Sequence, residues 1–317
     1  MPVSDHKSAP RAPRNRTLSL DDSDRERLRS SLINSDQSVP ASGHERIIRG
    51  DAFKVLPQLE TASFDLLFAD PPYNLTKVFG DQKFKQTTDD AYEQWLDSWL
   101  RLCVPLLKPT ASIYICGDWR SGSAIQRVGE KYFRLRNRIT WEREKGRGAK
   151  ANWKNASEDI WYFTVSDDFT FNLDVVKIRR KVLAPYTENG GPKDWEKNGD
   201  GNFRATHPSN LWTDISVPFW SMPENTDHPT QKPEKLLAKI ILASTNEGDN
   251  ILDPFAGSGT TAVVAKKLGR DFTAIESEED FCLLALKRLE IAAGDRSIQG
   301  YSDGIFWERN ARKPPPR

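Results

Sequence analysis

Short apolar runs alternate with segments of helical periodicity through most of the chain. The run at 64–69 is predicted to be a buried strand, and apolar residues recurring every three or four positions predict a helix over 89–107. The same patterns predict further strands at 46–49, 112–116, 135–141, 160–165, 250–253 and 271–275, and further helices at 234–244, 260–268 and 278–291. Strands that alternate with helices predict an α/β fold around a mostly parallel sheet.

Three stretches lack this alternation. Residues 1–42 are polar and poor in aromatic side chains, so we expect a largely disordered tail with a short helix around 21–32. Residues 166–225 show no helical period and contain NGGPKDWEKNGDGN, so we expect an insert of loops and short elements outside the sheet. Residues 294–317 end in a proline run and are expected to be a second tail. The regions 43–165 and 226–293 then form two halves of one α/β domain.

The composition narrows the class of protein without naming a partner. Of 317 residues, 37% are hydrophobic and 29% charged, and no apolar run reaches the roughly 20 residues of a membrane span, which fits a soluble globular protein. Three scattered cysteines argue against a disulfide framework or a zinc site and fit a reducing cytoplasm. The net charge is only +1, but residues 131–154 hold nine basic and two acidic side chains, typical of a solvated surface or of a phosphate-binding segment.

The predicted strand at 64–69 ends abruptly in the sequence Asp70-Pro71-Pro72-Tyr73. Neither proline has an N–H to donate, so the ladder cannot continue, and each proline fixes its own φ. Proline at 71 also biases Asp70 toward an extended conformation, so the carboxylate and the next carbonyl groups leave the strand in fixed directions. Open α/β sheets bind their ligands at the carboxyl ends of strands, which makes this loop a candidate site.

A second predicted strand runs into a glycine loop and a helix in the sequence NILDPFAGSGTTAVV. Gly257, Gly259 and Ala262 satisfy G-x-G-x-x-A, and Glu276 ends the next strand, where an acid can accept hydrogen bonds from a ribose. The same pattern fits a tight turn without a ligand. Its late position in the chain argues against a nicotinamide cofactor. A cofactor with a ribose and an adenine but no pyrophosphate, such as S-adenosylmethionine, would use the same loop and acid.

Taken together, three motifs give the chain a family resemblance. Asp70-Pro71-Pro72-Tyr73, FAGSGT at 255–260 and HPTQKP at 228–233 resemble the β-class DNA amino-methyltransferases, most strongly over 228–290 and well over 45–119. The resemblance implies a circularly permuted Rossmann-like sheet that binds S-adenosylmethionine, with an inserted target-recognition region at 166–225. It also implies methyl transfer to adenine N6 or cytosine N4, in many members as part of a restriction–modification system.

The resemblance assigns roles to residues of both motif loops. An exocyclic amine is a poor nucleophile because its lone pair is delocalised, so acceptors for its hydrogens must aim it, and Tyr73 offers a face on which a flipped base can stack. The implied catalytic residues are Asp70, Pro71, Pro72 and Tyr73. The implied cofactor-binding residues are Asp51, Asp70, Lys232, Asp253, Phe255, Ala256, Gly257, Ser258, Gly259, Thr260 and Glu276.

Several of these residues also have an ordinary structural interpretation. Asp51 after glycine is a routine helix N-cap, Lys232 can cap local structure instead of pairing with the methionine carboxylate, and Asp253 can brace its own loop. Tyr73 can pack over the end of the sheet. His228, with no clustered partner, is expected to be a structural hydrogen-bonding residue.

The basic segment and the insert are the expected DNA contacts. The resemblance places Arg143, Lys145, Arg147 and Lys150 at the target-base pocket as phosphate contacts, and Arg179, Arg180, Asn198, Asn202 and Arg204 among candidate base readers. Double-stranded DNA is the expected partner, and a homodimer and a cognate restriction endonuclease are compatible with the resemblance.

Aspartate at position 70 favours adenine, since cytosine-N4 members more often carry serine there. Cytosine N4, a catalytically inactive DNA-binding protein, and methylation of RNA or protein are the alternatives.

Overall fold

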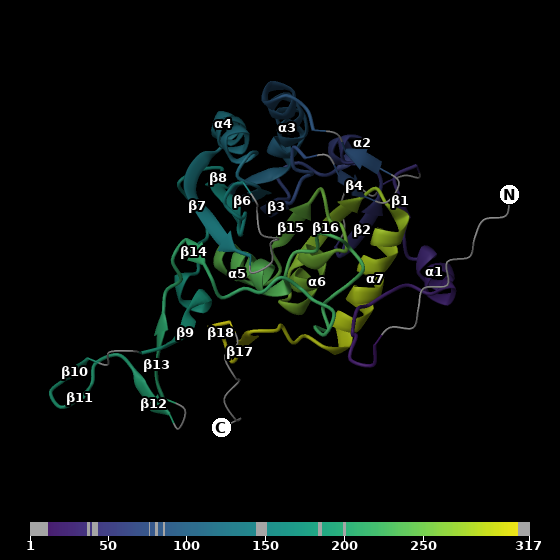
Figure 1. Cartoon of the computed structure of the whole chain (residues 1–317). Helices are drawn as coiled ribbons and strands as arrows, with labels where there is room; N and C mark the ends of the chain where they lie inside the picture. The colour runs from purple at the N-terminus through teal and green to yellow at the C-terminus, as the bar shows by residue number, and fades with distance from the viewer. Residues whose placement is uncertain are drawn as a thin grey trace.

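A nine-stranded sheet runs through the molecule with helices on both faces (Figure 1). The structure is a computed structural model that describes residues 12–36, 39, 44–75, 77–79, 82–84, 86–143, 151–182, 186–198 and 201–309. The strand order across the sheet is β1 (Ile33–Asn34), β2 (Arg46–Arg49), β16 (Asp271–Glu276), β15 (Asn250–Asp253), β3 (Phe64–Ala69), β6 (Leu107–Gly117), β8 (Ser157–Thr164), β7 (Arg134–Glu142) and β14 (Leu211–Trp212). Adjacent strands are parallel except at β6–β8 and β8–β7. The predicted mostly parallel α/β sheet is therefore confirmed.

Helices cover each face of the sheet and bury its apolar side chains. One face carries α2 (Ala52–Val55), α3 (Asp89–Cys103) and α4 (Gly122–Tyr132), and the other carries α5 (Glu234–Ser244), α6 (Thr260–Lys267) and α7 (Glu279–Gly294) (Figure 1). In β3, Leu66 and Phe68 enter the cluster under α5–α7, whereas Leu67 and Ala69 enter the cluster under α2–α4. Burial on both faces explains why the central strands have continuously apolar sequences.

The sequence predicted that the insert lies outside the main sheet, but one of its strands belongs to that sheet. Its strand β14 pairs in parallel with β7 and extends the sheet by one edge strand. Three other strands of the insert join two C-terminal strands in a second, five-stranded sheet that projects from the body. Its order is β12 (Glu196–Asn198), β13 (Gly201–Thr206), β9 (Ile178–Lys181), β18 (Ile305–Trp307) and β17 (Tyr301–Ser302) (Figure 1). The prediction of a C-terminal tail from 294 onward is thus wrong as far as residue 309, because β18 pairs with β9 and buries Phe306.

The polar N-terminal segment also contains ordered structure. The helix predicted around 21–32 is confirmed as α1 (Asp22–Arg29), which Asp21 caps by accepting a hydrogen bond from Asp24 N. It packs on α7 with Leu28 only 2% exposed, and Arg25 and Arg29 form ion pairs with Asp280 and Glu279 at 3.0 and 2.5 Å. Disorder is therefore the wrong prediction for residues 12–36. Charges that looked like a solvated tail are complementary to those of a helix 250 residues away.

The remaining elements are short. Two hairpins join β4 (Lys77–Phe79) to β5 (Gln82–Phe84) and β10 (Thr187–Glu188) to β11 (Gly191–Pro192), and 3₁₀ turns lie at Leu56–Gln58, Val104–Leu106 and Leu173–Val176. Cys103, Cys116 and Cys282 are buried free thiols. Over the described ranges, no helix is both long and apolar enough to cross a bilayer.

Candidate functional site

The two motif loops leave neighbouring strands at the same edge of the sheet. β3 and β15 pair in parallel, so the loops after Ala69 and after Asp253 lie side by side. From β3 the sheet continues to β6 on one side, and from β15 it continues to β16 on the other. This reversal is the switch point at which open α/β sheets bind their ligands. A cavity of about 400 Å³ opens here, large enough for a small cofactor.

The glycine loop forms one wall of this cavity. Gly257 and Gly259 have φ values of 53° and 74°, a region that side chains rarely adopt, and a Cβ at Gly257 would lie 2.8 Å from His228 Nε2. Gly259 leads into α6, and a Cβ there would lie 2.5 Å from that of Ala285 on α7. The loop therefore approaches both the cavity and the neighbouring helix more closely than any residue other than glycine allows.

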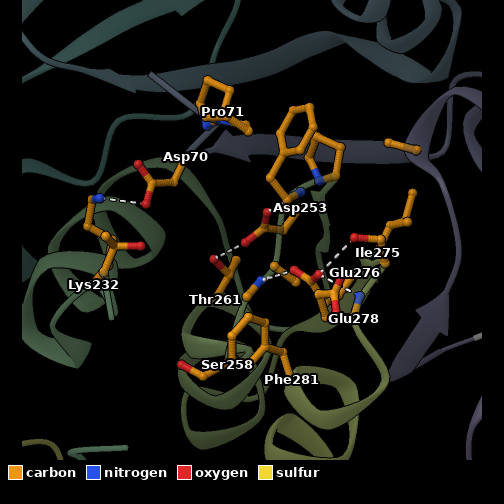
Figure 2. A pocket seen from close by; sticks show the side chains of 18 of the residues that line it. Asp70, Pro71, Lys232, Asp253, Ser258, Thr261, Ile275, Glu276, Glu278 and Phe281 are labelled. Atoms are coloured by element: carbon orange, nitrogen blue, oxygen red, sulfur yellow. Dashed lines mark hydrogen bonds and ion pairs between the residues drawn. The ribbon is translucent and has the colours of Figure 1, made fainter. Parts of the chain in front are cut away.

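Two carboxylates accept hydrogen bonds from this loop and from the helix that follows it (Figure 2). Asp253 accepts hydrogen bonds from Phe255 N at 3.0 Å and from Thr261 Oγ1 at 2.5 Å. Glu276, at the end of β16, accepts from Gly257 N at 2.8 Å and from Glu278 N at 2.9 Å. Burial raises the pKa of Glu276, although the backbone N–H groups oppose the shift. Its two oxygens keep lone pairs for further donors, as a contact with ribose hydroxyl groups would require.

Burial raises the pKa of Asp253 to about 7, against hydrogen bonds from Thr261 and Phe255 that lower it. Unfolded aspartate loses its proton near its ordinary pKa of 3.8, so the native state holds the extra proton between that value and about pH 7. The free energy of unfolding should therefore fall as pH rises through this window. Asp253→Asn keeps an acceptor for Phe255 N, places an amide N–H2 that donates to Thr261 Oγ1, and removes the titration. It should be more stable than wild type at pH 8, by up to about 4 kcal/mol, and similar in stability near pH 4.

Urea unfolding of the two proteins across this pH range is the measurement for Asp253. A difference in unfolding free energy that does not change with pH would show that Asp253 is already ionised in the native protein.

Asp51 and Phe255 complete the wall on the other side. Asp51 caps α2, since its carboxylate accepts a hydrogen bond from Phe53 N at 3.0 Å, and it also lines the cavity. The N-cap interpretation is therefore confirmed, and the cofactor contact of Asp51 stays a prediction that its place on the cavity wall allows. The Phe255 ring packs edge-on against Trp99 with centroids 5.1 Å apart, which anchors the loop to α3.

The DPPY loop is held in place by hydrogen bonds at both ends. Tyr92 Oη of α3 donates to Pro72 O at 3.1 Å, and Tyr73 Oη donates to Asp70 Oδ1 at 2.8 Å. Burial, followed by the charge of Asp70, raises the pKa of Tyr73 well above 10, so the phenol keeps its proton. The Tyr73 ring is thereby fixed beside the carboxylate of the motif.

Lys232 lies against Asp70 (Figure 2), an arrangement that the sequence interpretation did not include. Its Nζ is 2.5 Å from Asp70 Oδ2, 3.3 Å from Tyr73 Oη and 3.4 Å from Glu158 Oε2. Burial alone would lower the pKa of Lys232, but the carboxylates of Asp70 and Glu158 outweigh it and raise the pKa. Lys232 is therefore an ammonium whose first partner is the motif carboxylate.

Glu158, on β8, is a cavity residue that sequence reasoning missed. It lines the cavity and is 7% exposed, and its other oxygen is paired with Arg143. The signal available was an acid two positions before the apolar run IWYF, in a strand that lies between two others in the sheet. The expectation for His228 agrees with its surroundings: burial lowers its pKa to about 4, and its ring packs edge-on against Phe281.

The expected DNA contacts are spread over two regions. Arg143 pairs with Glu158 at the cavity, and Lys145, Arg147 and Lys150 lie outside the described residues. On β9 the guanidinium of Arg179 stacks on Phe203 at 4.7 Å and on Trp307 at 5.1 Å, so it packs within the protein. Arg180 has the opposite orientation and is the cross-strand partner of Arg204 on β13.

The cavity fits S-adenosylmethionine on observations of the protein itself. The glycine turn removes side chains from one wall, Glu276 ends the strand beside it with lone pairs left for ribose hydroxyl groups, and Asp51 supplies an acceptor on the opposite wall. Of the eleven expected cofactor residues, ten line the cavity: Asp51, Asp70, Lys232, Asp253, Phe255, Ala256, Gly257, Ser258, Thr260 and Glu276. Gly259 does not line the cavity, and its lack of a side chain allows α7 to pack closely against the loop.

Comparison with known proteins identifies the family. The family described as DNA methylase matches residues 64–287, more than half of the chain. The chain is 37% identical over 251 residues to DNA adenine methyltransferase YhdJ of Escherichia coli (strain K12), covering 78% of this chain and 83% of that protein. It is 36% identical over 256 residues to Type II methyltransferase M.HpaI of Haemophilus parainfluenzae, covering 78% and 74%.

A solved structure shows the same fold. TTHA0409, a putative DNA modification methylase from Thermus thermophilus complexed with S-adenosyl-L-methionine, matches with a TM-score of 0.53 at 22% identity, over 84% of this chain and 99% of the other. The family match and the two relatives above 30% identity agree with the motifs and with the cavity that they line. The chain therefore belongs to the DNA methylase family and is an S-adenosylmethionine-dependent DNA methyltransferase.

Proposed function

We propose that this enzyme methylates N6 of adenine in a base that is flipped out of double-stranded DNA. The observation that carries the proposal is the Asp70 carboxylate of DPPY, held at the cavity edge beside the glycine loop. Aspartate in this position favours adenine over cytosine, and the E. coli relative is named a DNA adenine methyltransferase. The family itself includes both N6 and N4 methylases, so the choice of base needs its own test.

The chemistry of the proposal is mainly positioning. The cofactor supplies an electrophilic methyl group on a sulfonium, and the amine nitrogen must present its lone pair in line, from about 3–3.5 Å. Asp70 and the Pro71 carbonyl are proposed to accept the two amine hydrogens, with Pro71 and Pro72 fixing their directions. As the N–C bond forms and the S–C bond breaks, the amine nitrogen becomes cationic and gives up a proton, for which the Asp70 carboxylate is the proposed acceptor.

Tyr73 is proposed to hold the flipped base by stacking. A base inside a duplex cannot reach the cavity, and methyltransferases swing it out and hold it between flat or apolar side chains. The hydrogen bond from Tyr73 Oη to Asp70 at 2.8 Å fixes the ring relative to the acceptor, so stacking and amine recognition are set together.

The cofactor contacts are proposed as follows. Glu276 accepts hydrogen bonds from the ribose hydroxyl groups, and the turn at 255–260 approaches the methionine portion, where Gly257 leaves room. Asp51 lies near the adenine ring of the cofactor while still capping α2. Lys232 is assigned to Asp70 rather than to the methionine carboxylate, because its Nζ is only 2.5 Å from Oδ2.

DNA contacts are proposed for the basic segment and for the projecting sheet. Arg180 and Arg204 are cross-strand neighbours on one face of that sheet. Among the described residues, Arg180 forms an ion pair with Glu308 at 3.9 Å and Arg204 forms one with Asp194 at 3.4 Å. Lys145, Arg147 and Lys150 are proposed as phosphate contacts from the sequence alone. Residues 166–225, with strands β17 and β18 added, are proposed as the target-recognition region.

Three further proposals concern the setting of the enzyme. A cognate restriction endonuclease is proposed because the M.HpaI relative carries the name of a type II methyltransferase. A homodimer and a cytoplasmic location are proposed from the family resemblance alone. Sedimentation of the purified protein, with and without DNA, tests the dimer. A species of about 36 kDa without DNA, and a complex with one protein chain per duplex with DNA, would contradict it.

Methylation-aware sequencing of DNA from cells that express the protein tests the function. We expect N6-methyladenine at one sequence context and none in cells expressing an inactive variant. N4-methylcytosine at that context would replace adenine with cytosine as the target. DNA binding without any methylation would favour an inactive DNA-binding protein.

A further inference from the structure

A series of buried charged side chains runs from the carboxylate of Asp70 through Lys232 to Glu158 on another wall of the cavity. Asp70, Lys232 and Glu158 come from the loop after β3, the segment before α5 and strand β8, and their side chains are 17%, 8% and 7% exposed. Charges removed from water in this way are costly unless they are well paired. The role of Asp70 as acceptor for the amine does not by itself call for either Lys232 or Glu158.

The charged groups of this series differ in how well their hydrogen-bonding capacity is satisfied. Glu158 Oε1 pairs with Arg143, but Oε2 is fully buried and has no hydrogen-bond partner among the described residues, and its nearest cation is Lys232 Nζ at 3.4 Å. Lys232 carries three N–H donors and uses one for Asp70 at 2.5 Å and one for Tyr73 Oη at 3.3 Å. The long contact with Tyr73 is the one that a better acceptor can replace, because Tyr73 already donates its own hydrogen to Asp70.

From this geometry we infer that Lys232 donates to the ring nitrogen beside the exocyclic amine of the target base, N1 in adenine. Asp70 and Lys232 then form two parallel hydrogen bonds with the Watson–Crick edge of the flipped base, one accepting from the amine and one donating to the ring. Glu158 is a positioning residue whose charge keeps Lys232 protonated and in place. The inference rests on the proposed adenine-N6 activity.

An acceptor beside a donor selects bases by their hydrogen-bonding pattern. Adenine and cytosine both present an amine next to a ring nitrogen that accepts, and this pattern matches Asp70 and Lys232. Guanine and thymine present a carbonyl next to a ring N–H, so a carboxylate would face an oxygen and an ammonium would face a donor. A site whose buried polar groups are left unpaired rejects the wrong ligand strongly. The pair therefore favours adenine and cytosine over the carbonyl and ring N–H edges of guanine and thymine.

The test compares adenine with 1-deazaadenine, in which a C–H group replaces N1, at the target position of a synthetic duplex. The recognition sequence comes from the sequencing experiment above, and methyl transfer is measured in single turnovers with the full-length enzyme. Because the analogue also changes the intrinsic reactivity of the amine, the rate ratio of the two substrates is compared between wild type and Lys232→Met. We expect this ratio to fall by about 10- to 100-fold in the variant, the value of one charge-assisted hydrogen bond.

A second buried lysine provides the matched control. Lys239 pairs with the buried Asp214 at 2.6 Å and does not line the cavity, so Lys239→Met also breaks a buried ion pair and should leave the substrate ratio as in wild type. Should Lys232→Met fail to fold, Glu158→Gln keeps the shape of the side chain and removes only its charge. It is expected to lower the same ratio while a general loss of packing would slow both substrates equally.

The outcomes separate this inference from the function on which it rests. Unchanged substrate ratios in Lys232→Met, or in Glu158→Gln where that variant has to be used, would overturn the role of Lys232 while adenine methylation stands. Absence of methyl transfer to the ordinary adenine duplex by wild type would overturn the adenine activity and this inference with it.

Discussion

Replacing Asp70 with alanine should lower the rate of methyl transfer by about 10³-fold or more while S-adenosylmethionine still binds within a few-fold of the wild-type affinity. The carboxylate is proposed to aim the amine and to receive its proton, contributions that together reach this size. The cofactor contacts proposed for Glu276 and for the glycine loop do not involve Asp70 directly. Single-turnover kinetics with labelled cofactor measure the first quantity, and calorimetric titration measures the second.

The control for Asp70→Ala lies at the other end of the same strand. Asp65 is also paired with a lysine, Lys108 at 2.8 Å, but it is remote from the cavity, so Asp65→Ala should retain transfer within a few-fold of wild type. Removing Asp70 leaves Lys232 with Glu158 alone, and a loss of stability follows from breaking a buried pair. Thermal unfolding therefore accompanies the kinetics. An Asp70→Ala protein that is folded and transfers methyl groups at the wild-type rate would refute the role.

Replacing Gly257 with alanine should weaken S-adenosylmethionine binding by about 10²-fold. Two effects add: the residue has φ of 53°, and the new Cβ would lie 2.8 Å from His228 Nε2, so either the loop or the histidine has to move. Both line the cavity, so either movement changes the shape of the cofactor site. Calorimetric titration of the cofactor is the measurement.

Two further variants separate the causes at Gly257. Gly257→Ala combined with His228→Ala removes the collision and keeps the backbone strain, so part of the lost affinity should return. Gly269→Ala places alanine at φ of 74°, where the new Cβ would meet only Glu247 Cγ at an ordinary contact distance of 3.9 Å. The position does not line the cavity, so the substitution should lower stability without changing cofactor affinity. Full affinity in Gly257→Ala would show that the loop does not contact the cofactor.

The central elements of the fold could be predicted because their signals are local. The strand at 250–253 and the helix at 234–244 were placed within the observed bounds, since a continuous apolar run and a helical period are visible in a short window. The convergence of DPPY with the glycine loop also followed, because parallel strands bring their carboxyl ends to one edge.

The remaining features depend on contacts between distant segments, which leave no periodic signal. Helix α1 is ordered because its arginines meet acids of α7, and β18 is ordered because it pairs with β9. Each segment in isolation has the composition of a tail. The same limit applies to the site: the contact of Lys232 with Asp70 spans 162 residues, and Glu158 belongs to no motif. The short motifs and the family resemblance predicted most residues that line the cavity. They did not predict the charged side chains that contact the carboxylate of Asp70.

The most direct test of the account is the nucleoside composition of DNA after incubation with the purified enzyme and labelled S-adenosylmethionine. Digestion to nucleosides and mass spectrometry should show the label in N6-methyl-2′-deoxyadenosine, with none in the Asp70→Ala sample. Label in N4-methylcytosine without N6-methyladenine, or equal adenine methylation by both proteins, would contradict it.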